Sequence, residues 1–134
     1  MIGIDESDII MFGRSIGSGP ASFVSSKRKP GALILMSAFK SIRDIVKDQA
    51  GNYLKYLVQE RFNNMKWIAK VQSPTFLVHG MKDNLISYKH SQDLHEQCKA
   101  PSTIVMPANM DHNDFDFIED LILPFYFFLK QIGM

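Results

Sequence analysis

A serine stands between two glycines in the segment Gly13-Arg14-Ser15-Ile16-Gly17. This Gly-x-Ser-x-Gly spacing is typical of a nucleophilic serine when a strand precedes it and a helix follows it. An apolar run at residues 9–12 comes before the motif, and helical periodicity follows over residues 16–27. We therefore expect Ser15 on a sharp strand-to-helix turn, where both glycines let the flanking segments approach closely. The backbone N–H of Ile16, at the start of the helix, is then placed to bind a developing oxyanion.

A serine hydroxyl is a weak nucleophile until a base removes its proton, and that base works best when a carboxylate orients it. Asp83 lies four residues beyond an apolar run at residues 75–79, and His112 follows a similar run at residues 103–106. Ser15, Asp83 and His112 thus each come just past a different predicted strand, in the order Ser, Asp, His. We expect His112 to activate Ser15 and Asp83 to orient His112.

Several other acids have simpler interpretations than catalysis. Asp111 and Asp114 flank His112, but they are its neighbours in a tight loop, and Asp114 is better placed to cap the last helix. Ser41 and Asp44 have the Ser-x-x-Asp spacing at which two side chains cap a helix start. Asp83 therefore remains the preferred acid.

Spacing also disfavours other kinds of site. His79 ends a buried strand and suits a hydrogen-bonded core position better than a catalytic base. His90, His95 and Cys98 are spaced i, i+5, i+8, which spreads them around a helix instead of converging them on a metal. The glycines at 13–19 lack the Lys-Ser/Thr pair of a phosphate loop and the third glycine of a dinucleotide fingerprint. We expect neither a metal nor another cofactor.

The elements that must position these residues alternate along the chain. Short apolar runs occur at residues 9–12, 32–36, 75–79 and 103–106. Helical pattern occurs at residues 16–27, 88–98 and 114–131, the last broken or bent near Pro124, and residues 49–70 are expected to hold one or two short helices. This alternation predicts an α/β fold with about four parallel strands flanked by helices.

Composition limits the remaining function classes. The 134 residues carry 15 Lys and Arg against 14 Asp and Glu, so a net charge of +1 disfavours nucleic-acid binding. A hydrophobic content of 46% suits one core and one domain, and the single cysteine rules out an intramolecular disulfide. Residues 1–8 lack a signal-peptide pattern, and the apolar stretch 121–129 is shorter than the roughly 20 residues of a transmembrane helix. We expect a cytoplasmic location, and we expect the aromatic run 125–128 to be core instead of a lipid-binding face.

Together these segments resemble the α/β-hydrolase superfamily, and within it the eukaryotic α/β-hydrolase-domain branch that contains protein depalmitoylases. The resemblance rests on residues 10–20, 37–44, 74–83 and 111–114. It implies that Ser15 is the nucleophile, Asp83 the triad acid and His112 the general base of a thioesterase or esterase that works through an acyl-enzyme. It also implies an S-acylated protein as the nearest substrate class, with a small ester as the alternative, and peripheral contact with membranes.

The chain is shorter than the family that it resembles, because the family domain has roughly 200–250 residues. We expect residues 1–134 to form a single partial domain, the C-terminal part of an α/β-hydrolase fold, with the early strands absent. The strand at residues 9–12 then becomes an exposed apolar edge that pairs with a protein partner or a second copy of the chain. Two functions stay open: a serine hydrolase, or a catalytically inactive truncated hydrolase that acts as an interaction or structural module.

Overall fold

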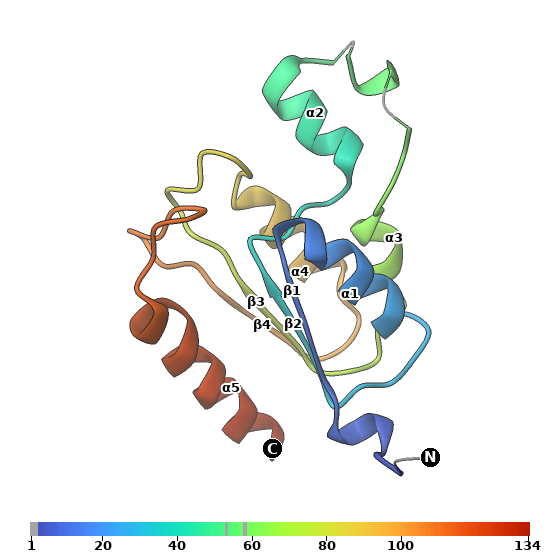
Figure 1. Ribbon diagram of the computed structural model, residues 1–134, viewed down its shortest axis with the longest axis vertical. Helices are drawn as coiled ribbons and strands as arrows, with labels where there is room; N and C mark the ends of the chain where they lie inside the picture. Colours follow the sequence, from blue (N-terminus) through green and yellow to red (C-terminus); the bar gives the residue numbers. More distant parts are fainter. Residues whose placement is uncertain (1–2, 53, 58) are drawn as a thin grey trace.

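The computed structural model describes residues 3–52, 54–57 and 59–134, and its centre is one parallel sheet of four strands (Figure 1). The parts of the sequence predictions that concern residues 1–2, 53 and 58 lie outside the described residues. The sheet order is β1-β2-β3-β4, and the strands are β1 (Ile10–Arg14), β2 (Ala32–Met36), β3 (Thr75–Val78) and β4 (Ser102–Val105). The predicted fold class is confirmed, and the strand boundaries agree with the apolar runs to within two residues.

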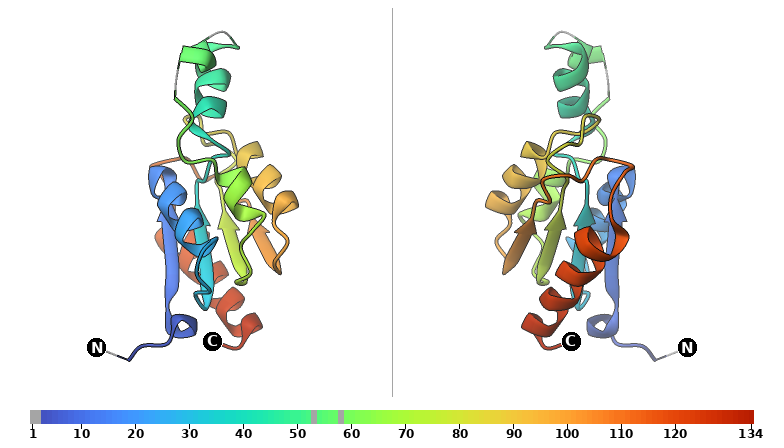
Figure 2. Two further views of the ribbon diagram at one scale, coloured as in Figure 1. Left: turned by 90° about the vertical axis from the view of Figure 1, so that its right-hand side faces the viewer. Right: turned by 90° about the vertical axis from the view of Figure 1, so that its left-hand side faces the viewer.

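The strands form where the sequence is apolar on both faces. All five residues of β2 and all four of β3 are buried, which is typical of parallel strands covered by helices on each side. One core cluster, which includes Leu33, Leu35 and Leu77, lies between the sheet and the helices α1, α3 and α4. The helix α5 covers the opposite face of the sheet (Figure 2). The other core cluster, which includes Ile34 and Phe76, lies under it, so side chains alternate between the two layers.

The helices other than α5 begin near the predicted positions. The helices are α1 (Ser18–Ser25), α2 (Ile42–Ala50), α3 (Asn64–Ile68), α4 (Lys89–Gln97) and α5 (Leu123–Ile132). The shorter turns are η1 (Glu6–Asp8), η2 (Ser15–Gly17) and η3 (Leu54–Leu57), and η4 (Phe117–Ile122) is a π-helix. Ser41 caps α2 as expected, because its Oγ accepts from the Asp44 N–H at 3.2 Å and donates to the Asp44 carboxylate. The predicted short helices within residues 49–70 correspond to η3 and α3.

The start of the last helical segment differs from the prediction. Asp114 is not its N-cap, because the Asp114 carbonyl accepts from the Asp111 N–H at 2.8 Å and closes a tight loop. The cap is Asp116, whose carboxylate accepts from the N–H groups of Ile118 and Glu119. The first turns form the π-helix η4, and α5 follows with Pro124 in its first turn, where a missing N–H costs least.

The aromatic run at the start of α5 is core only in part. Phe128 is 3% exposed and its ring centroid lies 5.3 Å from that of Phe76, and Phe125 packs against the same ring. Tyr126 and Phe127 are exposed, the latter by 64%, because the helical period turns them to the other side. No helix among the described residues is both long enough and apolar enough to cross a membrane.

Candidate active site

Ser15 is the first residue after β1 and has a left-handed backbone, with φ of +50°. This conformation is strained for any residue with a Cβ and is concentrated at functional sites. Gly13 permits the turn, because a Cβ there would lie 2.5 Å from the Gly17 carbonyl oxygen and 2.7 Å from the Ala21 Cβ. A Cβ at Gly17 would meet open space, so the expectation that both glycines relieve crowding is wrong for Gly17.

Ile16 continues this turn directly into a helical run formed by η2 and α1. Backbone N–H groups in the first turn of a helix have no acceptor within the helix. The Ile16 N–H therefore lies next to Ser15, at the N-terminal end of the helical run, and this end carries a partial positive charge.

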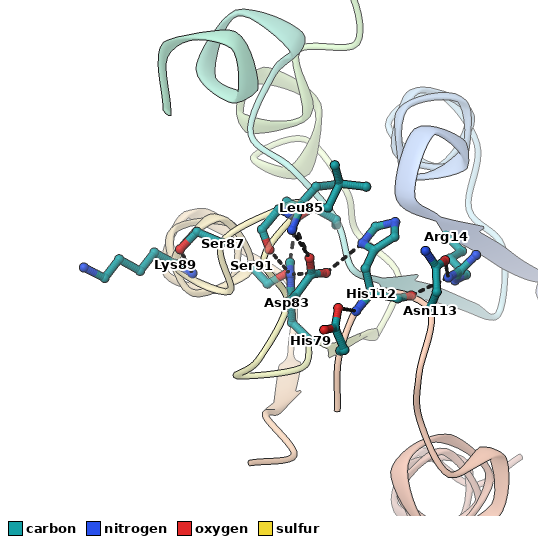
Figure 3. Close-up of polar contacts among 12 residues, drawn as sticks. Arg14, His79, Asp83, Leu85, Ser87, Lys89, Ser91, His112 and Asn113 are labelled. Atoms are coloured by element: carbon teal, nitrogen blue, oxygen red, sulfur yellow. Dashed lines mark hydrogen bonds and ion pairs between the residues drawn. The ribbon is translucent and has the colours of Figure 1, made fainter. Parts of the chain in front are cut away.

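Asp83 and His112 contact each other directly, with 2.7 Å between Asp83 Oδ2 and His112 Nδ1 (Figure 3). Both side chains are buried, and the other carboxylate oxygen accepts from the N–H groups of Leu85 at 3.0 Å and Ile86 at 2.8 Å. Burial alone would raise the pKa of Asp83, but hydrogen bonds from His79, the Ile86 backbone and His112 outweigh it and lower the pKa to about 2. Asp83 is therefore ionised at neutral pH.

The two loops that carry these residues are held together by their backbones. The Met81 N–H donates to the Pro107 carbonyl at 3.0 Å, and the Lys82 N–H donates to the Met110 carbonyl at 3.1 Å. Gly80 allows this approach, because a Cβ there would lie 2.1 Å from the Met110 oxygen. The segments after β3 and β4 thus converge at one edge of the sheet, as the carboxyl ends of parallel strands do.

Arg14 connects the Ser15 turn to the His112 loop, a role that the sequence did not indicate. Its guanidinium donates to the His112 carbonyl and, at 2.9 Å, to Asn113 Oδ1 (Figure 3). The guanidinium also lies 5.9 Å from the centroid of the Phe115 ring. Ser15 thus neighbours a residue that binds the His112 loop, although Ser15 and the His112 ring share no hydrogen bond within the described chain. The only sequence signal for Arg14 was its place in the Gly-x-Ser-x-Gly motif.

The alternative acids do not reach the His112 ring. Asp111 accepts from the backbone N–H of His112, and Asp114 is exposed. His79 is a buried core histidine as expected, with one ring nitrogen near Ser91 Oγ and the other near the Ile86 carbonyl.

The other residues considered as metal ligands point to different partners. Burial lowers the pKa of His90, whereas the Asp48 carboxylate 2.9 Å away opposes that effect. His95 pairs with Ser102 Oγ at 2.9 Å, and Cys98 Sγ faces the Ala100 carbonyl. Among residues 3–52, 54–57 and 59–134, no three His, Cys, Asp or Glu side chains are grouped to hold a metal ion.

Comparison with known sequences finds serine hydrolases and their relatives. The family "Serine hydrolase (FSH1)" matches residues 16–113, a range that contains Asp83 and His112 and begins one residue after Ser15. "Alpha/beta hydrolase domain-containing protein 17B" of Homo sapiens is 30% identical over 115 residues, which are 85% of this chain and 38% of the human protein. The 17C protein of Mus musculus is 29% identical, over 85% of this chain and 35% of its own length. The chain therefore spans little more than a third of these relatives.

Solved structures share the fold at low sequence identity. The esterase domain of a Rhodothermus marinus protein superposes with a TM-score of 0.67 and 14% identity, over 92% of this chain and 59% of that domain. Acetyl xylan esterase 1 from Thermoanaerobacterium sp. JW/SL YS485 has a TM-score of 0.69 and 12% identity, over all of this chain and 48% of the esterase. The four strands and their helices are thus arranged as in α/β-hydrolase esterases.

Proposed function

The chain belongs to the Serine hydrolase (FSH1) family, and from this membership we propose that it cleaves an acyl ester or thioester through an acyl-enzyme. Ser15 is the nucleophile, His112 the general base, Asp83 the acid that orients it, and the Ile16 N–H an oxyanion donor. The observation that carries the proposal is the 2.7 Å contact between Asp83 Oδ2 and His112 Nδ1, at the sheet edge where Ser15 has its strained backbone.

The proposed reaction follows from the direction of that hydrogen bond. An ionised Asp83 holds a proton on Nδ1 of His112 and leaves Nε2 free to accept the proton of the Ser15 hydroxyl. The Ser15 Oγ then bonds to the acyl carbon, and the carbonyl oxygen takes the negative charge beside the Ile16 N–H. His112 returns the proton to the leaving thiol or alcohol as its bond to the acyl carbon breaks. Water deprotonated by His112 then cleaves the acyl-enzyme, releases the acid and restores Ser15.

We propose an S-acylated protein as the substrate class, as the resemblance to the depalmitoylase branch implies. Exposed apolar side chains near the site support an acyl substrate, because Ile16 follows the nucleophile and Met81 and Leu85 flank Asp83. Such a substrate is bound to membranes by its acyl chain, so we propose a cytoplasmic location with peripheral membrane contact. A small ester is the alternative substrate, since it requires the same chemistry.

Turnover of paired substrates tests this function. The purified chain is assayed with an S-acyl peptide and with an O-acyl ester of the same acyl length, as wild type and as Ser15→Ala. Ser26→Ala is the matched control, because Ser26 lies at the opposite end of α1 and its hydroxyl donates to the Phe23 carbonyl. We expect Ser15→Ala alone to abolish turnover. Equal turnover in wild type and Ser15→Ala would refute the mechanism, and cleavage of the ester alone would refute the thioester substrate.

A second candidate function, that of an interaction module, is supported by the free side of β1. Within the described chain β1 pairs only with β2, and its Phe12 side chain is 52% exposed. Apolar hollows flank the strand on its two sides, one of about 310 Å³ and one of about 230 Å³. The first is lined by Phe12, Ile34, Phe117, Leu121, Ile122 and Phe125, and the second mainly by Ile9, Met11, Val24 and Pro30. A strand that pairs with β1 would therefore be apolar on both faces.

We propose that such a strand covers β1, either from another protein or from a second copy of this chain. Light scattering after gel filtration, with Phe12→Asp as the variant, tests for the second copy. A wild-type dimer that becomes a monomer in Phe12→Asp supports self-association, and a wild-type monomer argues against it. Pairing through β1 together with an absence of Ser15-dependent turnover would favour the module over the enzyme.

A further inference from the structure

His79 lies directly behind the Asp83 carboxylate and has no place in the reaction proposed above. It is the first residue after β3, its backbone N–H continues the sheet by donating to the Val105 carbonyl at 3.1 Å, and its ring is fully buried. Ring Nδ1 lies 2.7 Å from Ser91 Oγ on α4, and ring Nε2 lies 2.8 Å from the Ile86 carbonyl oxygen (Figure 3). Both ring nitrogens therefore have a partner inside the protein.

These two partners determine which nitrogen carries the proton. A carbonyl oxygen can only accept, so Nε2 of His79 must donate to Ile86. In the neutral ring Nδ1 is then an acceptor, and the Ser91 hydroxyl donates to it at 2.7 Å in preference to the Ala38 carbonyl, which lies 3.5 Å from the same oxygen. The hydrogen bonds thus run in one direction, from Ser91 on α4 through the ring to the loop that follows β3.

The same N–H of His79 also faces the acid. Nε2 lies 3.3 Å from Asp83 Oδ2, the oxygen that His112 Nδ1 contacts at 2.7 Å. Ile86 closes the arrangement, because its carbonyl accepts from His79 while its N–H donates to Asp83 Oδ1 at 2.8 Å. Asp83 is therefore held on both oxygens, and His79 restrains the carboxylate and the loop that surrounds it.

We propose that Ser91 and His79 form a positioning pair that keeps the Asp83 carboxylate directed at His112. This inference rests on the proposed function, because it assigns the pair to the hydrolytic site. The Ile86 carbonyl and Asp83, which can only accept, keep the proton of His79 on Nε2, and Ser91 holds the ring in place by donating to Nδ1. When the Ser91 hydroxyl is lost, Nδ1 has no donor and the ring is free to turn, so its Nε2–H is no longer held toward Asp83.

Imidazole NMR on isotope-labelled chain tests the pair without requiring activity. In the wild type we expect His79 to carry its proton on Nε2 at neutral pH, and the His112 Nδ1–H to exchange slowly with water. In Ser91→Ala we expect a shifted His79 Nδ1 resonance, because this nitrogen loses its hydrogen-bond donor, and faster exchange of the His112 proton by about tenfold. The matched control is Ser102→Ala, which removes the hydroxyl of another His–Ser pair, that of His95 one turn further along α4, and should leave both signals unchanged.

Kinetics add a second readout that general destabilisation would not produce. We expect Ser91→Ala to lower kcat about tenfold at unchanged KM, and Ser102→Ala to leave both constants as in the wild type. A wild-type His79 protonated on Nδ1 would overturn the inference even if Ser91→Ala did not fold. So would a folded Ser91→Ala with the wild-type His79 Nδ1 resonance and wild-type exchange of the His112 proton. If the wild type has no turnover, the proposed function fails, and the NMR result still decides whether Ser91 and His79 position Asp83.

Discussion

Replacing Asp83 by asparagine keeps the side-chain shape but removes the buried charge that two histidines contact. If the asparagine oxygen still accepts from the Leu85 and Ile86 N–H groups, its NH₂ group faces Nδ1 of His112 and Nε2 of His79. His112 must then accept at Nδ1 and carry its proton on Nε2, the nitrogen that has to accept from Ser15. We expect the turnover rate to fall by about 10⁴, as is typical when the acid of such a triad is replaced by its amide.

The same substitution changes how stability depends on pH. The folded chain holds the pKa of Asp83 at about 2, below its ordinary value of 3.8, so between these values the unfolded chain binds more protons. The ionised carboxylate therefore stabilises the fold by about 2 kcal/mol at neutral pH. This contribution is fully present above about pH 4 and is lost as the pH falls towards about 2.

Urea unfolding of wild type and Asp83→Asn, at pH values from about 7 down to about 2.5, measures the effect. The difference between their free energies of unfolding should shrink by most of about 2 kcal/mol over the lower part of this range. Asp114→Asn is the matched control, because Asp114 is exposed and its side chain makes no hydrogen bond within the described chain. A difference between wild type and Asp83→Asn that stays constant with pH would refute the reasoning.

Five further substitutions test the surroundings of the site and the packing of α5. Gly13→Ala should destabilise the chain by about 1–3 kcal/mol through overpacking, whereas Gly17→Ala should change its stability by less than about 0.5 kcal/mol. If both variants lose the same stability in urea unfolding, the difference in crowding between the two glycines is contradicted. Arg14→Ala should cost about 1–3 kcal/mol and speed amide hydrogen exchange in the loop after β4, and unchanged exchange would show that the Arg14 bridge is dispensable. Phe128→Ala should lower the free energy of unfolding by about 3–5 kcal/mol, because Phe128 is buried, and Phe127→Ala by less than about 0.5 kcal/mol, because Phe127 is exposed. A Phe127→Ala variant that unfolds at a lower temperature than Phe128→Ala would contradict this difference in burial.

The sheet was predictable because its strands are continuously apolar. In β2, the five residues Ala32–Met36 are all buried, and the sequence shows them as one uninterrupted run bounded by Gly31 and Ser37. The turn at Ser15 was predictable for a similar reason, since strand, motif and helix follow one another without a gap. The contact between Asp83 and His112 followed from one general rule, that parallel strands end at the same edge.

The features that sequence reasoning missed depend on contacts between distant segments. Arg14 binds the backbone carbonyl of His112, an acceptor that every residue possesses and that no sequence pattern marks. Asp114 and Asp116 both suit an N-cap, and the choice falls on Asp116 because a loop hydrogen bond occupies the Asp114 backbone. Gly17 occupies a motif position whose crowding depends on which way the helix leaves the strand.

The central claim, that Ser15 is an activated nucleophile, is tested most directly by covalent labelling with a fluorophosphonate. This reagent needs a serine whose proton a neighbouring base can accept, and intact mass spectrometry counts the attached groups. We predict one added group on the folded wild-type chain and none on folded Ser15→Ala. A folded wild-type chain that stays unlabelled, or a Ser15→Ala variant that labels equally, would contradict it.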